Sequence, residues 1–250
     1  MLGRMRSCLI LGSEVRDEDV AAALDCGADA LLLRLGPCVE DDARRSARGR
    51  ACAFIAEARR KSGATQLFVE VAPLESDLVE ADLDALFGPG PDGVFLPTCH
   101  GAASLQRMAV KLAVREAQAG LADGATRIGA FAGGDPAAVL ALRSFAGASR
   151  FEALAFDEAR LRAALGLAPG DGGAAIEMAR AMVILAAASA GVSALAPPVQ
   201  GREEAAYAVA RRDGFAGAMA LHPGQIATIH EVFPASRIDK PPNPRHRTGR

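Results

Sequence analysis

Three charged side chains lie at or just after short apolar segments and could act together on a small organic anion. Arg34 ends the segment ALLLR, Glu70 ends QLFVE, and Arg160 lies shortly after EALAF. An arginine inside an apolar segment needs an acceptor, and either Glu70 or an anionic ligand would serve Arg34. Both interpretations, an ion pair or an anion-binding site, stay open here. Arg34, Glu70 and Arg160 are the candidate catalytic residues.

Small and polar residues that follow other apolar segments are candidates for contacts with a substrate. They occur after GVFLP, after IGAFA and after GAMAL. His222 precedes a proline, so a structural role in a turn is the alternative for that residue. The predicted substrate-binding residues are Thr98, His100, Gly133, Gly134 and His222.

Three acidic residues are candidate metal ligands, and each also has a simpler explanation. Asp135 precedes Pro136, as the N-cap of a helix does when proline takes the first helical position. Asp157 and Glu158 could equally cap the helix that follows them and favour its positive N-terminus. Metal binding by Asp135, Asp157 or Glu158 is therefore a fallback hypothesis.

The segments that must position these residues alternate between short apolar runs and longer amphipathic ones, as β–α units do. Strands are predicted at residues 7–11, 30–34, 67–71, 93–96, 127–132, 153–156, 193–196 and 217–220. Helices are predicted at residues 17–26, 41–62, 78–87, 103–121, 136–145, 161–165, 174–190, 203–212 and 225–233. This order predicts an α/β fold, a single (β/α)8 TIM barrel, with a doubly wound open sheet as the alternative. In a barrel, the candidate side chains would meet at the carboxyl ends of the strands.

Length and composition limit the class of protein. The chain has 250 residues, of which 50% are hydrophobic and 23% charged, and its net charge is −2. This composition excludes a disordered protein, and the small net charge argues against nucleic acid or a membrane as partner. No apolar run approaches the ~18 residues of a membrane span, and the first residues lack the pattern of a secretory signal. The 5 cysteines show no CxxC spacing, so we expect a cytoplasmic protein without a disulfide framework.

The distribution of residues predicts one folded domain and a short tail. The TIM-barrel domain is expected over residues 1–236, and a basic, proline-rich tail over residues 237–250. From Lys240 the tail reads KPPNPRHRTGR, which contains no apolar side chain. We expect this segment to be disordered and solvated, with a contact to nucleic acid as the less favoured alternative.

Several motifs, in order from about residue 5 to residue 236, resemble one family. The segments are GADALLLRL, PDGVFLP, RFEALAFDEARLRAALG and, most specifically, GFAGAMALHPGQIATIHEVFPAS. They resemble the citrate lyase β-subunit-like proteins, which are CoA-ester lyases of the HpcH/HpaI aldolase superfamily. The resemblance implies a TIM barrel assembled as homo-trimers or homo-hexamers. It also implies Mg²⁺-assisted cleavage or formation of a carbon–carbon bond in esters such as citryl-CoA or malyl-CoA, with the metal and an arginine stabilising the enolate.

The metal site that the resemblance implies is altered in this chain. Arg160 stands where the family has a metal-binding Asp, and Glu70 stands where it has the substrate-binding Arg. The metal-binding Glu of the family falls at about Gly133, with a shift to Asp135 as the alternative. The acidic motif of strand two reads Leu33-Arg34-Leu35-Gly36-Pro37, and the lysine of Leu-Pro-Lys is Thr98. A divalent cation would face arginines, which is unfavourable by several kcal/mol at low dielectric constant. We therefore expect no Mg²⁺ site of the family type and no confidently assigned cofactor.

Three hypotheses about function follow. The chain is a lyase with a relocated metal site, or a barrel in which Arg160 supplies the charge of the metal and binds an organic anion. In the third hypothesis it is an inactive family member that serves as a structural subunit. The expected partners are a small oxo-acid or CoA ester and further copies of the chain. The chain also stops where the C-terminal lid of the family begins, so we expect a barrel without that lid.

Overall fold

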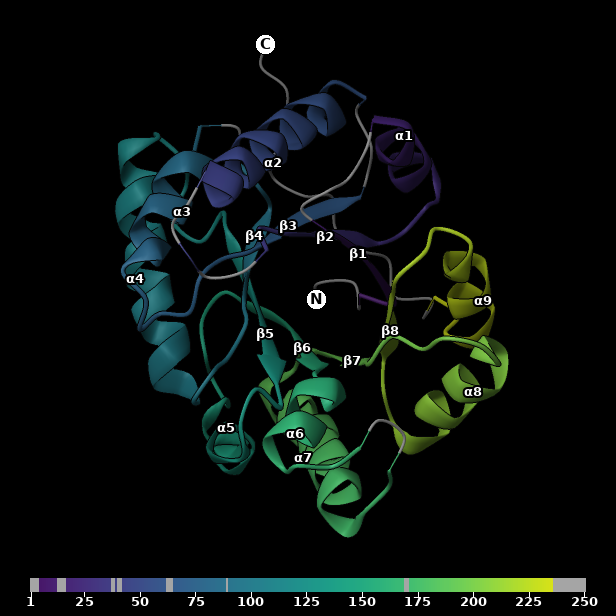
Figure 1. Ribbon diagram of the computed structural model, residues 1–250. Coiled ribbons are helices and arrows are strands. Elements are labelled where there is room, and N and C mark those ends of the chain that lie inside the picture. Colours follow the sequence, from purple (N-terminus) through teal and green to yellow (C-terminus); the bar gives the residue numbers. More distant parts are fainter. Residues whose placement is uncertain are drawn as a thin grey trace.

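Eight apolar segments form parallel strands that close into one barrel (Figure 1). The computed structural model describes residues 5–12, 17–36, 39, 42–61, 65–88, 90–168 and 171–235. The strands are β1 (Ser7–Leu11), β2 (Ala30–Arg34), β3 (Gln66–Glu70), β4 (Gly93–Leu96), β5 (Arg127–Ala132), β6 (Phe151–Phe156), β7 (Ser193–Ala196) and β8 (Gly217–Ala220). Each strand pairs with the next one, and β1 also pairs with β8. The predicted (β/α)8 barrel is therefore confirmed, and the open sheet is excluded.

Helices surround the barrel on its outside (Figure 1). They are α1 (Asp17–Asp25), α2 (Asp42–Arg60), α3 (Leu78–Leu86), α4 (Ala102–Gln118), α5 (Pro136–Leu140), the 3₁₀ turn η1 (Leu142–Ser144), α6 (Glu158–Ala164), α7 (Ala174–Ala190), α8 (Glu203–Asp213) and α9 (Gln225–Val232). Helix α6 begins three residues before its predicted start, because the Asp157 side chain accepts a hydrogen bond from the Arg160 backbone at 3.1 Å. This early start brings Arg160 into the first turn of α6.

The interior of the barrel is filled by large rings that lie beside glycines. The Phe68 and Phe95 rings meet edge to face at 5.6 Å, and the Phe95 and Phe131 rings are 5.2 Å apart. A Cβ atom on Gly93 would lie 2.3 Å from the Phe68 ring, and one on Gly129 would lie 2.1 Å from the Phe95 ring. The glycines therefore make room for a column of three rings, and Phe131 forms its end at the carboxyl side of the strands.

Ion pairs fasten the opposite end of the barrel, where the strands begin. Asp29 accepts hydrogen bonds from the Arg6 backbone and side chain at 2.9–3.0 Å. Ser7 Oγ lies 2.8 Å from His230 Nε2, and Asp29 Oδ1 lies 3.9 Å from the same nitrogen. Because serine and aspartate approach one ring nitrogen, this group is not a catalytic triad, in which they approach different ones.

The C-terminal residues lie outside the part of the chain that the structure describes. Residues 236–250 are not described, so the predictions of a disordered tail over 237–250 and of a missing lid stay predictions. None of the described helices combines the length and apolar character needed to cross a membrane.

Candidate functional site at the barrel mouth

The last residues of two neighbouring strands form an ion pair at the carboxyl end of the barrel. Arg34 and Glu70 pair in register across β2 and β3. Arg34 Nε donates to Glu70 Oε2 at 2.6 Å. The side chain of Glu70 is only 11% exposed, whereas that of Arg34 is 35% exposed. The carboxylate is thus held within the mouth, and its arginine partner reaches toward solvent.

Arg160 approaches the same carboxylate from the other side of the mouth. Its Nη2 donates to Glu70 Oε1 at 3.3 Å, and its Nη1 donates to the Pro97 carbonyl at 2.8 Å. Its Nε lies 3.2 Å from Asp157 Oδ2. Glu70 therefore joins Arg34 and Arg160, so the three predicted catalytic residues form one contact group although they are far apart in the sequence.

The ring of Phe131 forms the floor beneath both arginines. The Cζ atom of Arg34 lies 5.3 Å from the ring centroid, and that of Arg160 lies 5.9 Å away. Both distances fall within the range of cation–π contacts. Phe131 is not among the residues predicted from the sequence. The alternation of side chains along β5, which places Gly129 and Phe131 on one face of the strand, is the signal that identifies it.

Two cavities meet at these arginines. One of about 1070 Å³ is lined by Arg34, Phe131 and Arg160 and continues between α6, α7 and α8. The other, of about 460 Å³, is also lined by Arg34 and Arg160, together with Glu70 and Thr98. The arginines therefore stand where a small ligand can reach them from either side.

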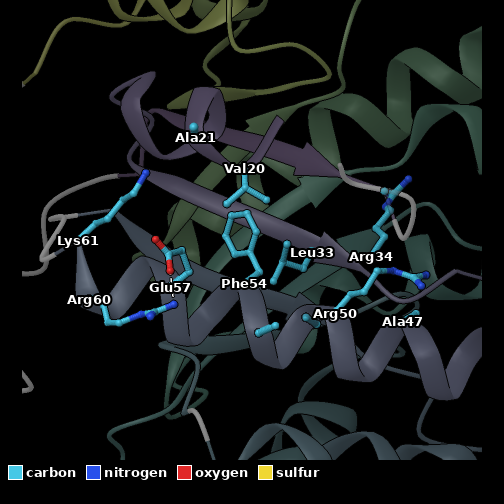
Figure 2. Close-up of a pocket in the computed structure, with 13 residues that line it drawn as sticks. Val20, Ala21, Leu33, Arg34, Ala47, Arg50, Phe54, Glu57, Arg60 and Lys61 are labelled. Carbon is cyan, nitrogen blue, oxygen red and sulfur yellow. Dashed lines mark hydrogen bonds and ion pairs between the residues drawn. The ribbon is translucent and has the colours of Figure 1, made fainter. Parts of the chain in front are cut away.

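A third cavity, of about 430 Å³, lies between α1, α2 and β2 and also touches Arg34 (Figure 2). Val20 and Phe54 face each other across it, beside Leu33 (Figure 2). Lys61 lines the end of this cavity that is remote from Arg34 (Figure 2). This space runs outside the barrel wall, so it is separate from the mouth itself.

The predicted substrate-binding glycines and threonine form a tightly packed part of the rim. Gly133 has φ +105°, and a Cβ atom there would lie 2.6 Å from the Asp157 carbonyl oxygen. A Cβ atom on Gly134 would lie 2.6 Å from Thr98 Oγ1. Glycine is required at Gly133 both by its backbone conformation and by this close approach. Thr98 is the member of this group that lines a cavity.

His100 and Asp135 form a separate pair on the rim. His100 Nε2 lies 2.8 Å from Asp135 Oδ2, while Asp135 Oδ1 accepts from the Ala138 backbone at 2.7 Å as the N-cap of α5. Burial alone would raise the pKa of Asp135, but the Ala138 hydrogen bond and His100 bring it below its ordinary value. Both oxygens of this carboxylate therefore have partners.

His222 occupies the turn that leads from β8 into α9. Its backbone N–H lies 3.2 Å from Gln225 Oε1, which also accepts from the Leu221 backbone at 2.7 Å. The mouth cavities described above are not lined by His222 or His100. The structure thus does not bring these two predicted residues to the arginines.

The candidate metal ligands already have ionic or hydrogen-bonded partners in the structure. Asp157 caps α6 and contacts Arg160, and Glu158 accepts from Arg162 at 2.9 Å with Arg180 at 3.7 Å. In the part of the chain that the structure describes, no three His, Cys, Asp or Glu residues are grouped as a metal ion requires. Each carboxylate has cations or backbone N–H groups as its neighbours, so an ion would have to displace them.

The buried cysteines near the barrel are not set up as nucleophiles. Burial raises the pKa of Cys99 to about 12, and it raises that of Cys8 to about 12 as well. At neutral pH both groups are thiols, and the thiolate is the reactive form. Neither thiol is therefore a candidate nucleophile.

Comparison with known proteins gives one family and a set of similar folds. The model of the HpcH/HpaI aldolase/citrate lyase family matches residues 16–223. A search of curated proteins returns no match. Among solved structures, RipC from Yersinia pestis is 23% identical with a TM-score of 0.71, covering 93% of this chain and 96% of that one.

Two further structures were solved with ligands. The citrate lyase β subunit from Mycobacterium tuberculosis, complexed with oxaloacetate and magnesium, is 20% identical with a TM-score of 0.71, covering 93% of this chain and 97% of that one. The Haloferax volcanii malate synthase magnesium/glyoxylate complex is 17% identical with a TM-score of 0.78, covering 94% and 77%. At these identities the similarity establishes the fold, and the ligands are properties of those proteins.

Proposed function

The chain belongs to the HpcH/HpaI aldolase/citrate lyase family, and from this premise we propose that it is a carbon–carbon lyase or aldolase for an oxo-acid or its CoA ester. In this proposal Arg34 and Arg160 hold the oxygens of the substrate in place of Mg²⁺. The observation that carries it is the convergence of both guanidinium groups on Phe131 beside the mouth cavities. Solved relatives with oxaloacetate or glyoxylate support the class of ligand.

The proposed chemistry follows from what the two arginines can donate. A guanidinium group binds a carboxylate through two parallel hydrogen bonds, which fixes the orientation of the acid. When the carbon–carbon bond of a hydroxy acid or its CoA ester breaks, the hydroxyl group loses its proton to water and becomes the carbonyl group of one product. The bonding electrons form the enolate of the other product, which then takes up a proton. A guanidinium group already in place stabilises the negative charge of the enolate. Glu70 is a positioning residue here, because it contacts both arginines at 2.6 and 3.3 Å.

The charges of the mouth support a mechanism without a divalent cation. Asp135, Asp157 and Glu158 each have a hydrogen-bonded or ionic partner already. A cation placed among them would also face Arg160, whose side chain is 40% exposed and contacts Asp157. Micromolar affinity for Mg²⁺ or Mn²⁺ in a calorimetric titration would contradict this part of the proposal.

Binding is the first test. Oxaloacetate, glyoxylate and acetyl-CoA are titrated by calorimetry into the full chain in EDTA and again in Mg²⁺. We expect binding in EDTA and at least a tenfold loss of affinity in Arg160→Ala, because a charge-assisted hydrogen bond contributes about 1.5–3 kcal/mol. Arg211→Ala is the matched control, since it removes the same charge from the exposed side of α8, where Arg211 donates to the Val232 carbonyl. An unchanged titration of Arg160→Ala would refute the assignment.

Turnover is the second test. Cleavage of citryl-CoA and malyl-CoA is followed in EDTA and in Mg²⁺, with release of the oxo-acid as the readout. Cleavage that survives EDTA and is lost in Arg160→Ala supports the proposal. Cleavage that requires Mg²⁺ would instead favour a relocated metal site.

A second candidate function is an inactive member that binds an organic anion or serves as a structural subunit. Its support is the charge balance of the mouth, where Glu70 and Asp157 already compensate Arg34 and Arg160. Binding without turnover would favour it, and so would co-purification with an active lyase paralogue. Assembly as a homo-trimer or homo-hexamer stays a prediction from the family resemblance, and the cytoplasmic location stays a prediction from the cysteine pattern and the first residues.

A further inference from the structure

Helix α7 is apolar on the side that faces solvent as well as on the side that faces the barrel. Its buried residues pack against β6 and β7. They are Ile176, Ala179, Val183, Ala186 and Ala187. Glu177 and Arg180 are the only charged residues of this helix. A helix that is apolar all round belongs to the interior of a structure, so we expect the outer side of α7 to be covered by another surface.

The exposed apolar side chains of α7 form a regular stripe along the helix. Its members are Ala174, Met178, Ala181, Leu185 and Ala188. Leu185 is 69% exposed, the highest value among the large apolar side chains that the structure describes. The members are separated by four, three, four and three residues, which is the spacing of a helix that packs lengthwise against another helix. Each large residue of the stripe lies between two alanines.

The stripe lies in the middle of a wider face. Helix α5 packs against one side of α7, and α8 lies on the other side, where Arg180 Nε is 3.2 Å from Asp213 Oδ2 (Figure 1). Leu140 of α5 and Val209 of α8 are exposed as well. Helix α7 has 17 residues, so it is about 26 Å long. With neighbouring helices about 10 Å away on each side, the face covers roughly 800 Å², the area that each partner buries in a stable interface of standard size.

We propose that this face binds the same face of a second copy of the chain, with the two α7 helices antiparallel about a two-fold axis. The stripe carries no charge, so a nucleic acid or a strongly charged peptide would find no electrostatic complement there. An alternation of large and small residues is complementary to itself when it is turned end for end, because each large side chain then packs against a small one. The proposal is independent of the chemistry proposed for the mouth.

The length of α7 selects the register of this contact. The two helices overlap almost completely when the two-fold axis passes near the middle of Ala174–Ala190. Leu185 then lies opposite Ala181 of the partner subunit, and Met178 lies opposite Ala188 of the partner subunit. Every layer of the contact thus joins one large and one small side chain.

The first test is the mass of the assembly in solution. Light scattering on the full chain should give an even number of copies. Leu185→Glu should halve that number, because the interface would bury unpaired carboxylates. Val110→Glu is the matched control, since Val110 is 61% exposed on the outer side of α4, and it should keep the mass of the unmodified protein. Circular dichroism should show the same helix content in both variants.

Three results of this experiment would overturn the proposal. They are a monomer or an odd number of copies for the unmodified chain, an unchanged mass for Leu185→Glu, and a halved mass for Val110→Glu. An even assembly that only Leu185→Glu halves supports the proposal.

The second test changes the packing without adding a charge, so it stays informative if Leu185→Glu does not fold. Leu185→Ala leaves a gap opposite Ala181 of the partner subunit, and Ala181→Leu places two leucines opposite each other. Each substitution alone should weaken self-association about tenfold in sedimentation equilibrium over a dilution series. Ala181→Leu combined with Leu185→Ala exchanges the large and the small side chain and should restore most of the affinity. A double variant as weak as the two losses together, or tighter association of Ala181→Leu alone, would refute the antiparallel contact.

Discussion

The two ends of this barrel use the same residue types in different ways. At the end where the strands begin, here called the base, Glu116 accepts hydrogen bonds from the Thr126 and Gly124 backbone N–H groups and from Arg150, whose side chain is 6% exposed. At the mouth, the side chain of Glu70 accepts hydrogen bonds from Arg34 and Arg160 and from no other described residue, and Arg160 is 40% exposed. Backbone donors cannot leave a carboxylate without disturbing the fold, whereas exposed guanidinium groups can turn to a ligand. The base therefore fixes structure, and the mouth can exchange partners.

The largest expected effect is at the base. Glu116→Gln removes a charge that Arg150 contacts at 2.7–2.8 Å and leaves that arginine buried with less compensation. We expect a loss of about 3 kcal/mol in the free energy of unfolding, because breaking a buried pair costs roughly that much. Urea denaturation measures it, with Glu57→Gln, from an exposed pair on α2, as the control. A loss below ~1 kcal/mol would remove the distinction between the two ends.

The second largest loss of stability is expected at a glycine on the rim of the mouth. Gly133→Ala places a Cβ atom 2.6 Å from the Asp157 carbonyl in a residue with φ +105°. We expect about 2 kcal/mol of destabilisation from strain and contact together. Gly147→Ala is a matched control, because Gly147 also has positive φ, at +75°, but has open space around it. Equal losses in the two variants would show that only the backbone conformation counts.

Low pH should destabilise the end of the barrel where the strands begin, because carboxylates there become protonated. Burial opposes ionisation of Glu116, but hydrogen bonds from Arg150, Thr126 and Gly124 bring its pKa below the ordinary 4.5. The unfolded chain therefore binds protons first, and the stability from this group is present above pH ~4.5 and is lost as the pH falls further. The difference between the unmodified chain and Glu116→Gln should narrow over that range in urea titrations. A constant difference would contradict the assignment.

The smallest expected effect is at the mouth. Glu70→Gln removes the negative charge between Arg34 and Arg160, so both cations are freer to bind an added carboxylate. We expect stability to change by less than ~1 kcal/mol, since both arginines are partly exposed, and oxaloacetate to bind about threefold more tightly. Calorimetry at low and high salt measures this gain, which should shrink as salt screens the charges. A large loss of stability would mean that Glu70 acts as the carboxylates of the base do.

The strands of the barrel could be predicted from the sequence because each one is indicated by a few consecutive residues. Strand β2 was expected at residues 30–34 and lies there, since ALLLR is a short apolar run that a turn precedes. The start of α6 was placed too late, because Leu161 begins the apolar pattern but the Asp157 side chain begins the helix. A capping hydrogen bond of this kind depends on one side chain and leaves little trace in periodicity.

The candidate site was predictable in part. Arg34 and Glu70 could be paired in advance, because each closes a neighbouring strand. The cavity beside Tyr207 could not be predicted, because it lies between helices that a strand separates in the sequence. His100 and Asp135 were both singled out, but their contact with each other depends on the loops after β4 and β5.

The stacked rings of Phe68, Phe95 and Phe131 inside the barrel determine how deep the mouth is. Gly129 admits the Phe95 ring, and that ring in turn supports Phe131, on which both arginines rest. A methyl group added at Gly129 would displace the Phe95 ring, and this ring would displace Phe131. The guanidinium groups of Arg34 and Arg160 would then change position as well. The position of the two guanidinium groups can therefore change through substitutions in the barrel interior, without any change in a residue that lines the mouth.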